Sequence, residues 1–198
     1  MMTNYGQELL RFPVNLLYNC NTYLIERVAK LEDALADVPK QLHLELMGDG
    51  EIDADWALVL RDVLNQRSRE TRLITSARST LKNGSVLVWL LGDRRLIRDD
   101  AKVFFRRANV TEEADIDPEK VWSECDMQYV DSFSEADPEE ASHAQALHYI
   151  NEFLPVRELA GRIVDVRTLR QFGLVGNEKL DHFLATTLGP TPTCNEES

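Results

Sequence analysis

Residues 41–64 read QLHLELMGDGEIDADWALVLRDVL, and this stretch decides the fold class. Leucines alternate with polar residues over 42–46, which is the period of a β-strand. The glycines within 48–50 mark a turn. Asp53 is a typical helix N-cap, and apolar residues recur after it at helical spacing. The stretch therefore predicts a strand, a glycine turn and a helix, which together are half of a βαβ unit.

The segments on either side continue this alternation. Apolar spacing predicts a helix over 21–36 that ends before Pro39. Later patterns predict a strand at 71–75, a polar loop at 76–83, a buried helix at 86–91, short strands at 96–97 and 101–105, helices at 139–154 and 155–164, and a short helix from 167 that ends at Gly173 and leads into a strand. Alternating elements of this kind predict an α/β fold, with a mixed, mostly parallel sheet covered by helices.

The chain has 198 residues, which is the size of one ordinary domain, and we expect a single domain over 1–188. Residues 112–140 are strongly acidic and are predicted to be an excursion from the core. Residues 189–198 have the proline, threonine and glutamate content of a disordered tail.

The net charge of −12 argues against nucleic acid or an anionic membrane as a partner, because both require clustered positive charge. Three widely spaced cysteines predict neither a disulfide framework nor a zinc site. The N-terminus lacks the features of a signal peptide, so we expect a cytoplasmic protein. Acidic residues around the 48–50 turn do not match a calcium loop, and no phosphate or dinucleotide motif is present, so no metal and no cofactor is predicted.

The order of these motifs resembles the Clp protease proteolytic subunit and its relatives in the crotonase-like superfamily. The glycine turn at 48–50 is similar to the family's glycine-rich loop after a strand. Gly84-Ser85 followed by the apolar run to Leu91 is similar to the turn and buried helix that carry the family's serine. The run Phe172-Gly-Leu-Val175 is similar to a late family motif. The resemblance implies stacked βαβ units, Ser85 at the nucleophile position, and assembly into trimers, hexamers or rings.

The chain departs from this family at the expected base. Arg106 stands where the resemblance implies a histidine, and an arginine side chain stays protonated in proteins. Asp165 is the only carboxylate in the region of the family's aspartate. A serine needs a neighbouring base to become a nucleophile. Lys82 and the helix histidine His143 are the candidate bases that remain.

We therefore predict a catalytically degenerate Clp-protease-like protein that acts by homo-oligomeric assembly or by binding a peptide or protein. The basic stretch 94–107 and the acidic stretch 112–140 are candidate subunit contacts. One alternative is a serine peptidase or hydrolase, with Ser85 as nucleophile and backbone amides near Gly48, Gly50 and Gly84 as the binding and oxyanion groups. Another is a crotonase-type enzyme that acts on an acyl thioester.

Overall fold

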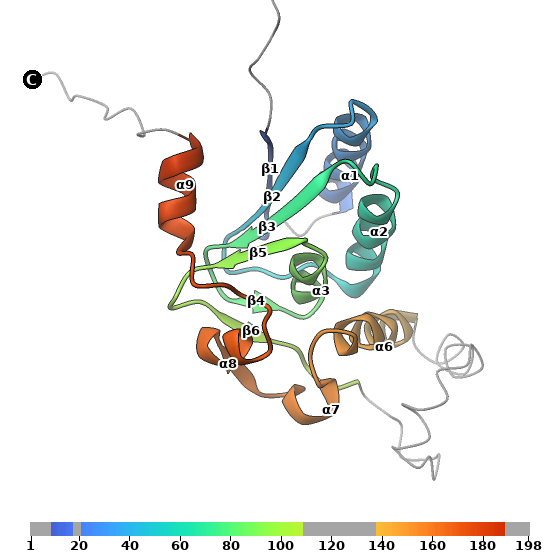
Figure 1. The fold of residues 1–198 in the computed structure, drawn as a ribbon. Coiled ribbons are helices and arrows are strands. Elements are labelled where there is room, and N and C mark those ends of the chain that lie inside the picture. The colour runs from blue at the N-terminus through green and yellow to red at the C-terminus, as the bar shows by residue number, and fades with distance from the viewer. Residues whose placement is uncertain (1–8, 18–20, 109–137, 189–198) are drawn as a thin grey trace, which may run out of the picture.

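A computed structural model describes residues 9–17, 21–108 and 138–188, and these residues form two β-sheets with helices around them (Figure 1). The larger sheet is parallel, with the strand order β1-β2-β3-β5, and is formed by β1 (Leu9–Asn15), β2 (Gln41–Met47), β3 (Arg72–Ala77) and β5 (Arg94–Ile97). The smaller sheet is mixed, with the order β4-β6-β7, and is formed by β4 (Leu81–Lys82), β6 (Lys102–Phe104) and β7 (Ile163–Asp165). This architecture confirms the predicted mixed, mostly parallel α/β class.

Helices cover both faces of the larger sheet (Figure 1). One face packs against α1 (Asn21–Ala36), α2 (Ala54–Asn65) and α3 (Gly84–Leu90), and α6 (Pro138–Asn151) lies against α2 and α3. The opposite face carries α9 (Leu180–Leu188). The short helices α7 (Val156–Leu159) and α8 (Val166–Gln171) lie on either side of β7 in the chain. Among the described residues, no helix is long and apolar enough to cross a membrane.

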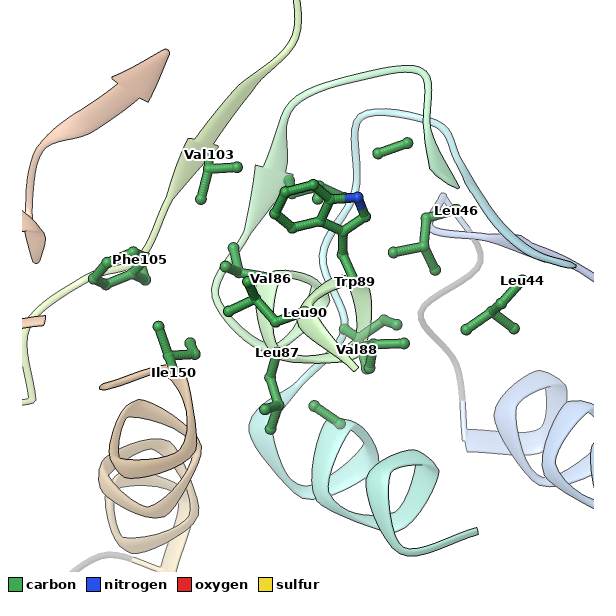
Figure 2. Packing of buried hydrophobic residues seen from close by; sticks show 14 of the residues in the cluster. Leu44, Leu46, Val86, Leu87, Val88, Trp89, Leu90, Val103, Phe105 and Ile150 are labelled. Atoms are coloured by element: carbon green, nitrogen blue, oxygen red, sulfur yellow. The ribbon is translucent and has the colours of Figure 1, made fainter. Parts of the chain in front are cut away.

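Helix α3 is the centre of the core, because each of its residues is buried. Figure 2 shows its side chains pointing in several directions, toward Leu44 and Leu46 of β2 and toward Val103 and Phe105 near β6. The indole nitrogen of Trp89 donates a hydrogen bond of 3.1 Å to the carbonyl oxygen of Leu96, so this large buried side chain has its polar atom satisfied. A helix buried on all sides has no amphipathic pattern. Its prediction rested on the turn that precedes it, and the structure confirms it.

The predictions for 21–36 and 41–47 are confirmed with the same bounds. Three others were wrong. The loop predicted at 76–83 contains the end of β3 and all of β4. The helix predicted at 155–164 ends at Leu159 and is followed by β7. Residues 174–175, predicted to begin a strand, lie outside the helices and strands. The excursion at 112–140 falls largely outside the described residues, and the tail at 189–198 lies wholly outside them.

Strand β1 was not predicted. It lies at the edge of the sheet, where it pairs only with β2, and Pro13 stands opposite Glu45. Proline cannot donate a ladder hydrogen bond and is tolerated mainly on edge strands, so the proline is consistent with this position. A second apolar cluster joins the sheet to α9 through Ile74, Leu96, Leu180, Phe183 and Leu184. The sheet is therefore buried on both faces.

Candidate functional site

The candidate site lies at the turn between β4 and α3, where the resemblance implies a nucleophile. The residue in the turn is Asn83, with φ 45° and ψ −119°. These angles are close to those of the first central residue of a type II′ turn, a position dominated by glycine, asparagine and aspartate. A strained strand-to-helix turn is also where hydrolases of the elbow type present their serine. In this chain the residue at the strained turn position is Asn83, which has an amide side chain.

Both ends of the Asn83 side chain are tied to neighbours. Its Oδ1 accepts a hydrogen bond of 3.0 Å from the backbone nitrogen of Arg106, and its Nδ2 donates one of 2.9 Å to Oε2 of Glu51. The Asn83 backbone nitrogen donates to the carbonyl oxygen of Phe104, and Asn83 forms an isolated parallel bridge with Ile52. These contacts fix the amide between the end of β6 and the loop before α2.

Arg106 is held in the same cluster by a carboxylate. Its guanidinium donates from Nη1 to Oε1 of Glu140 at 2.9 Å, and its Nη2 lies 2.8 Å from Oε2. This two-pronged geometry is the strong form of an arginine–carboxylate pair. Glu140, in the first turn of α6, is buried. The hydrogen bond to Glu140 raises the pKa of Arg106, so the guanidinium stays charged and pins α6 to the end of β6.

His143 lies one helical turn after Glu140 and is also buried. Its Nε2 lies 3.2 Å from the carbonyl oxygen of Arg106. A carbonyl can only accept a hydrogen bond, so Nε2 carries the proton and Nδ1 is left as the acceptor. Burial, and then the nearby charge of Arg106, lowers the pKa of His143, so the imidazole is neutral at physiological pH.

Ser85 is fully buried in the first turn of α3. Its Oγ accepts a hydrogen bond of 2.9 Å from the backbone nitrogen of Ile52, which ties the loop before α2 to the start of α3. Lys82 is exposed on β4. Within the described residues, neither Lys82 nor His143 forms a hydrogen bond with Ser85. The structure thus places Ser85 in a core contact and does not bring a base to its hydroxyl.

The three glycines of the predicted site occupy positions that a side chain could not share. A Cβ on Gly50 would lie 1.7 Å from the carbonyl oxygen of Leu16, and one on Gly84 would lie 2.4 Å from that of Ile52. Gly48 has φ +92°, and a Cβ there would lie 2.8 Å from Cγ of Leu17. Close packing against backbone carbonyls explains Gly50 and Gly84, whereas Gly48 is explained by its positive φ and by the side chain of Leu17; the three glycines bring the loops after β1, β2 and β4 together.

A second buried polar cluster lies on the face of the sheet that α9 covers. Nε2 of His43 lies 2.8 Å from Oγ of Ser76, and burial lowers the pKa of His43 to about 4. Burial raises the pKa of Glu45, but hydrogen bonds and charges from Arg11 and Arg78 outweigh it, and the net pKa is lowered. Within the described residues, no group of three or more metal-ligating side chains lies together, either here or near Asn83.

Searches of family models and of curated proteins by sequence found no match. The fold, in contrast, has many counterparts among solved structures. The ClpP protease catalytic domain from Plasmodium falciparum superposes with a TM-score of 0.59 at 9% identity, over 85% of this chain and 83% of that one. A mutant of ClpP1 from Listeria monocytogenes superposes with a TM-score of 0.55 at 11% identity, over 85% of this chain and 88% of that one. The chain has the Clp protease fold. This confirms the divergent Clp-protease-like assignment at the level of fold, while identities this low leave the activity open.

Asn83, Glu51 and Glu140 were not among the residues predicted for the site. Asn83 could have been singled out, because asparagine directly before glycine is a strong turn signal and it precedes the apolar run of α3. Glu140 carried only the weaker signal of an acid at a helix start. No pattern in the sequence pairs Glu140 with Arg106, because β6 and α6 meet only in the folded chain.

Proposed function

We propose that this chain is a catalytically inactive Clp-protease-like subunit that acts by assembling with copies of itself. The observation that carries the first half is Asn83. The strained turn that would present a nucleophile holds an amide whose two ends are bonded to the Arg106 backbone and to Glu51. The asparagine side chain carries no hydroxyl or thiol that a base could activate for attack on a substrate and is not itself a base at neutral pH, and the nearby guanidinium stays protonated.

The remaining polar groups of the site support the same proposal. The Arg106 guanidinium forms an ion pair with Glu140. The Ser85 hydroxyl is buried, and its oxygen accepts a hydrogen bond from the backbone nitrogen of Ile52. A hydrolytic mechanism would also need a base at the Ser85 hydroxyl, and among the described residues the hydrogen bond formed by this hydroxyl is the one it accepts from Ile52. The evident role of these contacts is to hold α3, α6 and the loop before α2 in place.

The assembly half of the proposal rests on charge and on an exposed sheet face. All the arginines of the basic stretch 94–107 already form hydrogen bonds within the subunit. Lys82 of β4 and Lys102 of β6 are different, because both are exposed and, within the described residues, neither forms an ion pair. Ile163 of the neighbouring β7 is 66% exposed.

Among the described residues, the smaller sheet therefore has a surface with two exposed lysines that form no ion pair and one exposed apolar side chain, and the exposed Asp165 stands opposite Lys102 in the ladder. The stretch 112–140 has Lys120 as its only basic residue among many acids. Opposite charges on two surfaces steer and orient association. We therefore place the contact between the acidic stretch of one copy and the Lys82–Lys102 face of the next.

Light scattering after size exclusion tests this proposal directly. The protein should be a symmetric oligomer at about 0.05 M salt and should dissociate toward about 1 M, where the screening length falls to about 3 Å. The double variant Lys82→Glu/Lys102→Glu should weaken association. Lys30→Glu, which reverses an exposed lysine of α1, is the control and should leave association unchanged. A monomer at every salt concentration would refute the assembly half.

A further inference from the structure

Asn83 and Gly84 form the single Asn–Gly pair in the chain, and they stand at the strained turn. An Asn–Gly pair can close a five-membered succinimide ring when the glycine nitrogen attacks the asparagine side-chain carbonyl. The ring requires Cβ and that nitrogen to lie on the same side of the Cα–C bond. Seen along the Cα–C bond, Cβ of Asn83 lies about 120° from the backbone nitrogen of the same residue, because Cα is tetrahedral. A ψ of −119° therefore nearly eclipses Cβ of Asn83 with the nitrogen of Gly84. The backbone is already in the ring-forming conformation.

The side-chain contacts favour the same reaction. Attack on the amide carbon moves negative charge onto Oδ1, and the backbone nitrogen of Arg106 donates to that oxygen at 3.0 Å. A fixed donor aimed at developing charge is the arrangement that stabilises such an intermediate. Nδ2, the nitrogen that departs, donates a hydrogen bond to Glu51, which orients the amide group. Asn83 is only partly buried, so water reaches the turn.

We propose that Asn83 is a self-modification site, at which the chain converts an amide into a carboxylate. The backbone nitrogen of Gly84 forms a bond to Cγ of Asn83, and the bond from Cγ to Nδ2 breaks. The proton lost by Gly84 ends on the departing nitrogen, carried by water, and ammonia leaves. One water molecule then opens the succinimide at either carbonyl, which gives aspartate or isoaspartate. The step needs water alone and involves no oxidant or reductant.

The product changes the site it forms in. A carboxylate at position 83 stands where the amide now donates to Glu51 at 2.9 Å, and two carboxylates this close cannot both ionise easily. Isoaspartate also inserts a carbon into the main chain at the junction of β4 and α3. Either product loosens the contact that fixes the loop before α2 to the start of α3.

Peptide mapping by mass spectrometry, with fragmentation that separates aspartate from isoaspartate, tests the proposal. The full-length folded protein is incubated at mildly alkaline pH beside the same protein unfolded in urea. We expect Asn83 to convert in the folded protein at least as fast as in the unfolded chain, while Asn65 and Asn151 stay intact. Asn83→Gln, which would need a slower six-membered ring, should release no ammonia from this peptide. Conversion of Asn83 in urea but not in the folded protein would overturn the proposal, because the hydrogen bonds would then protect the amide.

Discussion

The buried imidazole of His43 makes a definite prediction about acid stability. His43 is fully buried in β2, bonded to Ser76, with its ring edge-on to Phe183 of α9 at 5.2 Å between centroids. Its Nδ1 has no hydrogen-bond partner among the described residues. Protonation would therefore place a charge in an apolar contact between the sheet and α9. Burial is the main reason that its pKa is lowered from 6.5 to about 4.

The direction and the magnitude of the pH effect on stability follow from this pKa shift. At His43, the folded protein binds fewer protons than the unfolded chain between pH 6.5 and about 4. The contribution of His43 to the free energy of unfolding is therefore present above pH 6.5 and is lost as the pH falls through that window. The shift corresponds to roughly 3 kcal/mol. His143, whose pKa is also lowered, adds a loss of the same sign.

Urea unfolding at several pH values, for the wild type and for His43→Gln, measures the effect. Glutamine places an amide nitrogen near the position of Nε2 and does not titrate. We expect the variant to lose roughly 3 kcal/mol less than the wild type between pH 6.5 and 4. If both proteins lose the same free energy across this window, the reasoning about His43 is refuted.

Three further predictions concern the candidate site, and urea unfolding checks each of them. Arg106→Leu should lower the free energy of unfolding by about 2 kcal/mol, which is less than for a fully buried pair because the arginine side chain is 34% exposed. Adding Glu140→Leu should recover much of this loss, and a loss near zero in the single variant would contradict the pairing. Ser85→Ala should cost about 1–2 kcal/mol, because the amide of Ile52 loses its acceptor, and an unchanged free energy would show that water replaces the hydroxyl. Gly84→Ala should lower the free energy of unfolding by about 1–3 kcal/mol or more, because the new Cβ clashes with the carbonyl oxygen of Ile52. Gly176→Ala, where a Cβ meets open space, should be nearly neutral, and equal effects of the two substitutions would contradict the packing argument.

The elements with regular patterns were predictable from the sequence. Alternating leucines fixed the bounds of β2, and apolar spacing fixed those of α1. Helix α3 followed from the turn before it, because the apolar run 86–91 alone fits a buried strand as well as a buried helix. Strand β1 was missed because its sequence has no clear alternation and contains Pro13. Strand β4 was missed because a strand as short as Leu81–Lys82 is held by pairing with β6, which local sequence does not show.

The site was less predictable than the fold. The sequence drew attention to Ser85 as the candidate nucleophile and to Arg106 in the place of a base, and both roles stay predictions. Structure was needed to show that Asn83 holds the strained turn and that Ser85 faces Ile52. The dihedral angles of a turn residue such as Asn83 cannot be derived from composition. The Arg106–Glu140 pair joins β6 to α6, so it depends on tertiary packing.

Labelling with a fluorophosphonate probe, followed by mass spectrometry of the labelled peptide, measures the nucleophilicity of the hydroxyls directly. With the turn held by Asn83 and the oxygen of Ser85 bound to a backbone amide, the purified protein should take up no probe at any pH at which it is folded. Probe found covalently on Ser85, and lost in Ser85→Ala, would contradict the account of an inactive subunit.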